Sequence, residues 1–74
     1  MQYKTLGSYI RKKREEKNIS LNKFAVDYEI DTAILSRIER NLQDIKLNTL
    51  VKIANGFDLL PSELLKGYEK TLEV

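Results

Sequence analysis

The stretch SLNKFAVDYEIDTAILSRIER, from Ser20 to Arg40, decides the fold of this chain. Its pattern predicts two short helices, one over Ser20–Tyr28 and one over about Thr32–Arg40, separated by a tight bend. Ser20 and Asp31 stand where these helices begin. Their side-chain oxygens suit N-cap positions, because they accept hydrogen bonds from backbone N–H groups that the first turn leaves unpaired. Two short helices joined in this way form a helix-turn-helix.

Apolar residues at helical spacing indicate the inner faces of the two helices. Phe24 and Ala25 lie on the inner face of the first, where the small Ala25 allows a close approach. Leu35 and Ile38 lie on the inner face of the second, three residues apart as an α-helix requires. Ile30 fills the corner between them. We therefore expect these residues to form one side of a single core.

The rest of the chain predicts three further helices around the same core. One runs from the candidate N-cap Thr5 to Lys17, and another covers about Leu47–Gly56. The last opens at Pro61, a favoured first helical position, and continues to about Gly67. Tyr68–Val74 is either a frayed tail or part of a dimer contact. The pattern predicts an all-α fold of five short helices, with one domain over residues 1–74 and its core over about 5–67.

The composition excludes several function classes. The chain has 74 residues and neither cysteine nor histidine, so it lacks thiolate ligands, disulfides and the commonest general base. Its carboxylates form no recognisable pocket motif, and its 3 glycines form no phosphate-binding loop. We expect neither an enzyme nor a metal or cofactor site. No apolar run approaches the length of a membrane span and no secretory signal is present, which predicts a cytoplasmic protein.

Basic charge is concentrated in the first third of the chain. Residues 1–23 carry seven Lys and Arg against two Glu, whereas residues 24–74 carry six bases against nine acids, within a net charge of +2. Such asymmetry is expected for a phosphate-binding surface. A solvated helix face produces the same pattern, so charge alone does not decide for a nucleic acid.

A set of residues spread along the chain has a characteristic order and spacing. The set is Leu6-Gly7, Ile10-Arg11, Arg14-Glu15-Glu16, Ser20, Phe24-Ala25, Ser36-Arg37-Ile38-Glu39-Arg40, Leu50, Ile53-Ala54 and Glu63-Leu64. In this register the chain resembles the XRE-type (lambda repressor and Cro-like) DNA-binding domains over roughly Leu6–Lys66. The resemblance rests on the combined register and implies a compact, lambda-repressor-like domain whose partner is double-stranded DNA.

The resemblance implies that the helix from Thr32 to Arg40 enters the major groove. The residues on its outward face that we expect to reach base edges are Thr32, Ala33, Ser36 and Arg37. Arg37 has the geometry to pair with a guanine through two hydrogen bonds. A phosphate contact or a surface ion pair is the alternative role for this arginine.

The same docking geometry predicts contacts to the phosphate backbone. The amino ends of the two helices and the loop after the second would face it. The candidates are Ser20, Asn22, Lys23, Arg40, Asn41, Gln43 and Lys46. Lys12, Lys13 and Lys17 are further possibilities that plain surface charge explains equally well.

Arg14 and Glu39 have a different expected role. In the family the matching arginine and glutamate form a partly buried ion pair between the first helix and the recognition helix, so we expect a structural pair here. The chain departs from the family pattern at several positions, and in particular Leu21 replaces a glutamine and Glu29 replaces a turn glycine. Glu29 must then adopt a positive φ, or the bend must differ. The segment 31–46 has no net charge.

Together these features predict a sequence-specific regulator of transcription, most simply a repressor acting as a homodimer on an inverted repeat. One monomer reads too few base pairs to find its site among genomic competitors. The predicted dimer face comprises Leu59, Leu60, Leu64 and Tyr68, which otherwise close the core. A protein-interaction module with weak or no specific DNA binding remains an alternative, as does RNA binding by the basic first helix. Restriction–modification controllers and antitoxins fit the sequence equally.

Overall fold

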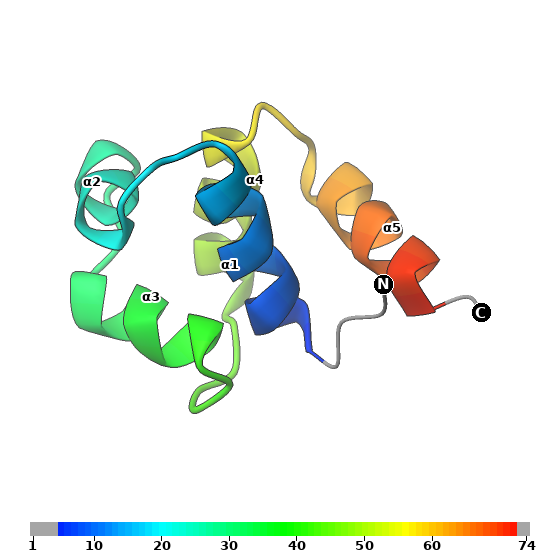
Figure 1. Cartoon of the computed structure of the whole chain (residues 1–74), viewed down its shortest axis with the longest axis horizontal. Coiled ribbons are helices and arrows are strands. Elements are labelled where there is room, and N and C mark those ends of the chain that lie inside the picture. The colour runs from blue at the N-terminus through cyan, green and yellow to red at the C-terminus, as the bar shows by residue number, and fades with distance from the viewer. Residues whose placement is uncertain (1–4, 73–74) are drawn as a thin grey trace.

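The computed structural model describes residues 5–72, and within them it contains five helices. They are α1 (Leu6–Glu16), α2 (Leu21–Asp27), α3 (Thr32–Glu39), α4 (Leu47–Gly56) and α5 (Pro61–Leu72). In Figure 1, α2 and α3 lie on one side of α1 and α5 lies on the other, with α4 behind α1. This arrangement confirms the predicted five-helix, all-α fold.

The carboxyl-terminal helix is longer than predicted. α5 continues five residues beyond Gly67, to Leu72, so residues 68–72 are helical and not a frayed tail. Its extension has a tertiary cause, because the Tyr68 ring packs against the Tyr9 ring of α1 with centroids 5.7 Å apart. The predicted arm before Thr5 and the last two residues lie outside the described residues.

Side chains cap the amino ends of the first three helices. The hydroxyl of Ser20 accepts from the Lys23 N–H at 3.1 Å, and the Asp31 carboxylate accepts from the Ile34 N–H at 3.0 Å. Thr5 and Ser8 form a reciprocal capping box at the start of α1. α4 begins after Lys46 without a side-chain cap. The capping pattern therefore confirms the predicted helix starts in the helix-turn-helix.

Four helices end in the same backbone motif without using glycine. The residues just past α1, α2, α3 and α4 have φ between 56° and 60°, and they are Asn18, Glu29, Asn41 and Asp58. At the end of α2, the Ile30 N–H donates to the Ala25 carbonyl at 2.8 Å, while the Glu29 N–H donates to the Val26 carbonyl at 3.4 Å. This pair of bonds is a Schellman motif. Glu29 therefore adopts the left-handed conformation that a glycine would take at this turn position.

Replacing Glu29 by glycine is expected to raise the free energy of unfolding by about 0.5–1 kcal/mol. The left-handed region is unfavourable for a residue with a Cβ, so glycine relieves this strain. The free energy gained is expected to exceed the cost that comes from the greater conformational freedom of glycine in the unfolded chain. Asn18→Gly is the matched control, with a smaller expected gain because asparagine tolerates this conformation. Urea denaturation of both variants measures the difference, and equal changes would contradict strain at Glu29.

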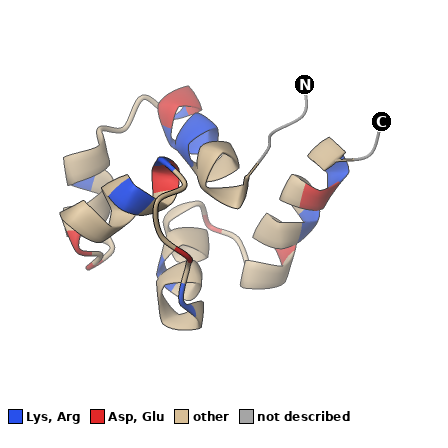
Figure 2. Ribbon diagram, turned by 90° about the horizontal axis from the view of Figure 1, so that it is seen from below, with Lys and Arg blue, Asp and Glu red and all other residues tan. Residues whose placement is uncertain are grey.

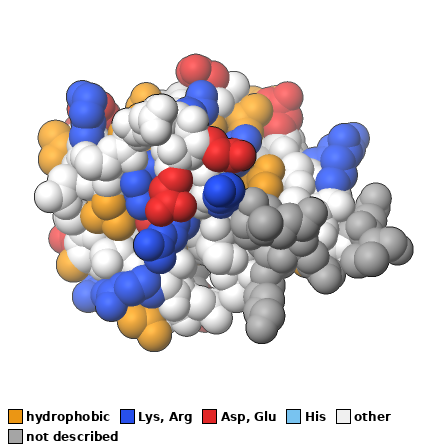
Figure 3. All heavy atoms as spheres, viewed as in Figure 1, with side chains coloured by type: hydrophobic (Ala, Val, Ile, Leu, Met, Phe, Trp, Pro, Cys, Tyr) orange, Lys and Arg blue, Asp and Glu red, His pale blue; other side chains and the backbone are white. Residues whose placement is uncertain are grey.

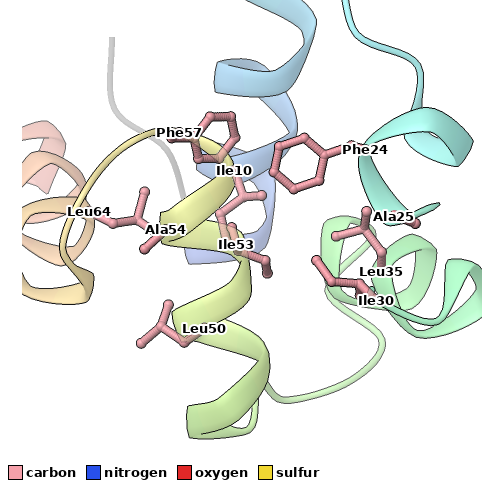
Figure 4. Packing of buried hydrophobic residues seen from close by; sticks show 10 residues of the cluster. All are labelled: Ile10, Phe24, Ala25, Ile30, Leu35, Leu50, Ile53, Ala54, Phe57 and Leu64. Atoms are coloured by element: carbon pink, nitrogen blue, oxygen red, sulfur yellow. The ribbon is translucent and has the colours of Figure 1, made fainter. Parts of the chain in front are cut away.

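One apolar core joins all five helices. Its members are Ile10, Phe24, Ala25, Ile30, Leu35, Leu50, Ile53, Ala54, Phe57 and Leu64 (Figure 4). Gly7 allows α1 to approach α3 closely, because a Cβ at this position would overlap the Ile38 carbonyl oxygen. Leu47 occupies the apolar stripe of α4 by spacing, yet it is 74% exposed. The core thus holds α3 against α1 and α2 while part of the α4 surface remains apolar.

Candidate nucleic-acid interface

α3 presents one continuous face to solvent. Leu35 and Ile38 on its inner side are 0% and 1% exposed, so the orientation of the helix is fixed by packing. On its outer side Arg37 is exposed and Ser36 is half-buried. One turn earlier, Ala33 is exposed and Thr32 is half-buried in the same way. The four predicted base-reading residues, Thr32, Ala33, Ser36 and Arg37, therefore share one face of α3.

A buried ion pair fixes α3 to α1. The Arg14 guanidinium donates to both carboxylate oxygens of Glu39, from Nε and from Nη2, each at 2.9 Å. Its Nη1 also donates to the Ile19 carbonyl at 2.6 Å. The Arg14 and Glu39 side chains are 10% and 3% exposed, so Arg14 is placed as a structural residue and not as a surface contact. Hydrogen bonding to Glu39 raises the pKa of Arg14 above its ordinary value.

Arg37 is held by a residue from the loop after α3. Its Nε donates to Oε1 of Gln43 at 2.8 Å. Within residues 5–72 Arg37 has no acidic partner, so the surface ion pair considered from the sequence does not form there. The sequence predicts a phosphate contact for Gln43, whereas in the structure its carbonyl oxygen accepts from Arg37, the candidate base reader.

The other candidate phosphate contacts lie at two places. Ser20, Asn22 and Lys23 lie at the amino end of α2, where the Ser20 hydroxyl already caps the helix and Lys23 pairs with Asp27 at 3.0 Å. Arg40, Asn41 and Lys46 are exposed around the end of α3 and the following loop. Both places adjoin α3, because Leu21 at the amino end of α2 lies with Ser36 and Arg40 around one hollow.

A hollow of about 150 Å³ lies between α1, α2 and α3. It is lined by Arg11, Arg14, Leu21, Ser36, Glu39 and Arg40. Arg11 is a residue that the sequence reasoning left out of the candidate site, although it stands in the basic run of the first helix. It pairs weakly with Glu15, at 3.3 Å on an exposed surface. Arg11 thus adds one cation beside Arg40, which is already a candidate phosphate contact.

The remaining basic residues of α1 divide between surface and packing. Lys12 and Lys17 are exposed, whereas the Lys13 Nζ lies 5.8 Å from the Tyr9 ring centroid and 5.6 Å from that of Phe57. Lys13 therefore covers apolar surface and interacts with ring faces. Basic segments occur in α1 and in the second half of α3, while α5 alternates in sign (Figure 2). The space-filling view shows basic side chains over α3 and α1 with acidic ones between them (Figure 3).

The predicted dimer face needs a correction at Leu64. This side chain is 0% exposed because α5 packs on α4 and α1 through it, so it closes the core. Leu59 and Tyr68 are half-buried, whereas Leu60 is 64% exposed. Only Leu60 of the four residues presents a largely free apolar side chain.

Other kinds of site find no support in the described residues. Across residues 5–72 no group of three acidic, histidine or cysteine side chains is placed to hold a metal ion. None of the helices in that range is long and apolar enough to span a bilayer. A hollow of about 360 Å³ lies between the start of α1 and the α3–α4 loop. It is lined by Leu6, Gly7, Ile38, Asn41, Gln43, Asp44 and Ile45.

Comparison with known proteins identifies the family. A family model described as helix-turn-helix matches residues 10–64. The control protein C.MunI from a Mycoplasma species is 34% identical over 65 residues, which cover 86% of this chain and 88% of that protein.

Solved structures show the same architecture. SinR, the master regulator for biofilm formation, solved in complex with DNA, superposes with a TM-score of 0.75 at 34% identity over 82% of this chain and 98% of that chain. The SinR–SinI protein complex gives 0.78 at 33% identity over 93% and 68%. ClgR, the clp gene regulator from Corynebacterium glutamicum, shares the fold with a TM-score of 0.77 at 20% identity over 89% and 70%. The chain therefore belongs to the XRE-type helix-turn-helix family of DNA-binding transcriptional regulators.

Proposed function

We propose that this chain is a sequence-specific repressor of transcription that binds double-stranded DNA in the cytoplasm as a homodimer on an inverted repeat. The observation that carries the proposal is the exposed face of α3, whose orientation is fixed by the buried Arg14–Glu39 pair. A rigidly held helix with small and hydrogen-bonding side chains on its free face suits the major groove. The similarity to a control protein and to a regulator solved with DNA supports this role.

Each residue on the α3 face has a distinct chemical role in this proposal. The Arg37 terminal nitrogens donate to O6 and N7 of one guanine. The methyl groups of Thr32 and Ala33 contact a thymine methyl, and the Ser36 hydroxyl pairs with a neighbouring base or phosphate. Through these contacts the helix-turn-helix reads a short half-site.

Phosphate contacts fix the register of α3 on the duplex. Ser20, Asn22 and Lys23 bind phosphates at the amino end of α2, while Arg40, Asn41 and Lys46 bind phosphates around the carboxyl end of α3. Arg11 joins this set because it lines the hollow beside Arg40. Occupying a promoter with such a complex blocks polymerase without any further domain, which makes repression the simplest regulatory mechanism.

A homodimer supplies the base pairs that one monomer cannot read. Two recognition helices would then lie about 34–36 Å apart, one turn of DNA. Exposed apolar side chains mark the candidate dimer surface, since Leu47 and Val51 lie one turn apart on α4 and are 74% and 46% exposed. Most of α4 carries no charge (Figure 2), which is typical of an interface core. We propose that Leu60, Leu47 and Val51 contact a second copy, with Leu59 and Tyr68 at its edge.

Replacing Leu47 or Val51 by glutamate is expected to dissociate the dimer without unfolding the monomer, because both side chains are exposed. Analytical ultracentrifugation measures the assembly, and thermal melting at low concentration checks the fold. Val26→Glu is the matched control, since Val26 is 72% exposed on α2 and outside the proposed surface. Equal dissociation by all three variants, or by none, would contradict this dimer surface.

The function is tested by selection from a pool of random duplex DNA at two salt concentrations. We expect enrichment of an inverted repeat and a steep loss of affinity as salt rises, because phosphate binding releases counterions. Absence of binding at low salt would overturn the proposal. That result would favour a protein-interaction module, which the net neutral segment 31–46 and the exposed apolar α4 surface also fit.

RNA binding is disfavoured by the placement of the aromatic rings. Phe24 packs against Tyr28 and Phe57, each with ring centroids 5.0 Å apart, and Tyr9 packs against Tyr68. These rings are engaged within the fold, so within residues 5–72 they do not form an exposed platform on which unpaired bases stack. Competition between single-stranded RNA and duplex DNA would distinguish the two partners.

A further inference from the structure

The hydrogen bond between Arg37 and Gln43 joins the recognition helix to the loop that follows it. Nε of the exposed Arg37 donates to Oε1 of Gln43 at 2.8 Å. A guanidinium carries five N–H donors in a planar fork, so this bond leaves the terminal nitrogens free. The contact therefore fixes the plane of the guanidinium without occupying the atoms that bind a base.

The backbone places Gln43 where it reaches Arg37. Asn41 adopts φ 60°, and the Leu42 N–H donates back to the Arg37 carbonyl at 2.8 Å. The Asn41 N–H donates to the Ile38 carbonyl at 3.0 Å, which completes a Schellman motif at the end of α3. The chain therefore reverses over the last turn of α3 and brings Gln43 beside Arg37.

The Gln43 side chain is itself restrained. It is half-buried and lines the hollow of about 360 Å³ together with Leu6 and Ile38. An acceptor with a packed stem orients its donor better than a fully exposed one, because fewer rotamers remain available to it. Gln43 thus has both the chemistry and the restraint needed to orient an arginine.

We propose that Gln43 is a positioning residue that sets base specificity by holding Arg37 ready for a guanine. This inference rests on the proposed function of α3. A long arginine loses rotamer freedom when it docks on a base, and orienting it in advance removes part of this loss. The benefit occurs only where a guanine meets Arg37, so Gln43 raises affinity for the matched site and not for other sequences. Gln43 therefore acts through Arg37 and not as the phosphate contact that the sequence indicates.

A double-mutant cycle tests this coupling. The variants are Gln43→Met, which keeps the side-chain length but removes the acceptor, Arg37→Ala, and the two together. Affinity is measured for the selected site and for the same site with the guanine opposite Arg37 replaced by adenine. We expect Gln43→Met to reduce the ratio of these affinities about twofold to tenfold, and to have no such effect when Arg37 is alanine.

Gln43→Glu supplies the conservative rescue. Glutamate keeps an acceptor oxygen at the same distance, so the affinity ratio is expected to stay near that of the unmodified chain even if overall affinity falls. In the DNA-free protein, the NMR resonance of the Arg37 Nε–H should lose its hydrogen-bonded chemical shift in Gln43→Met. In Gln43→Glu it should keep the chemical shift of a hydrogen-bonded N–H. Thermal melting of both variants checks that the loop change leaves the fold intact.

The outcomes separate this inference from the proposed function. A uniform loss of affinity on all duplexes, independent of Arg37, would make Gln43 a phosphate contact and overturn the inference alone. Failure of the unmodified chain to prefer any sequence would overturn the proposed function and the inference with it. Loss of discrimination in Gln43→Met that disappears without Arg37 would establish the positioning role.

Discussion

Glu39→Ala is expected to lower the free energy of unfolding by about 3–5 kcal/mol, because it leaves the buried Arg14 charge without its partner. Arg14 is 8% exposed, and after the substitution it retains only the Ile19 carbonyl as an acceptor. Stabilities of small domains total about 5–15 kcal/mol, so a substantial part of the fold's stability would be lost. Urea denaturation followed by circular dichroism measures the change.

The exposed pair Arg11–Glu15 provides the matched control. Its side chains are 54% and 48% exposed, so Glu15→Ala is expected to change stability by no more than about 0.5 kcal/mol. The double variant Arg14→Met, Glu39→Leu should recover much of the loss, because apolar residues of similar volume need no partner. A loss for Glu39→Ala as small as that for Glu15→Ala would contradict a buried structural pair.

The pH dependence of this pair follows from the direction of the Arg14 shift. Hydrogen bonding to Glu39 raises the pKa of Arg14 above its unfolded value. A group whose folded pKa is raised contributes stability fully below its unfolded pKa, and loses it as pH rises through the folded value. The arginine contribution is therefore present throughout the neutral range and is lost only in strong alkali.

Local signals account for most of what the sequence predicts correctly. The caps at Thr5, Ser20 and Asp31 depend on neighbours within a few positions, so residue type alone identifies them. Arg14 and Glu39 are 25 positions apart in the sequence, so local spacing cannot predict their contact. The resemblance to the family predicts it instead.

The features that sequence reasoning missed depend on tertiary packing. The extension of α5 follows from the contact between Tyr68 and Tyr9, which no local pattern contains. Leu64 and Leu60 are both apolar, and only the packing of α5 on α1 and α4 buries the first and exposes the second. The bond from Arg37 to Gln43 depends on the chain reversal at Asn41. Side-chain chemistry was thus readable from the sequence, whereas these three tertiary contacts were not.

Arg37→Ala is expected to lower discrimination at one base pair of the selected site about fivefold to 150-fold, because a bidentate arginine–guanine contact contributes about 1–3 kcal/mol. The side chain is exposed, so stability should change little. Competition binding against sites altered at each position in turn measures the effect. Lys66→Ala is the matched control, since this exposed cation lies on α5, away from the recognition face, and should leave affinity and specificity unchanged.

Arg37→Lys separates base reading from phosphate binding. Lysine keeps the positive charge but lacks the planar fork that pairs with O6 and N7 of guanine. If Arg37 reads a base, the lysine variant loses discrimination while its salt dependence stays close to that of the unmodified chain, because the number of cations at the interface is the same. If Arg37 binds a phosphate, Arg37→Lys retains discrimination and Arg37→Ala weakens binding to all duplexes equally. The second pattern would remove Arg37 from the base-reading set and leave Thr32, Ala33 and Ser36 to supply the specificity of α3.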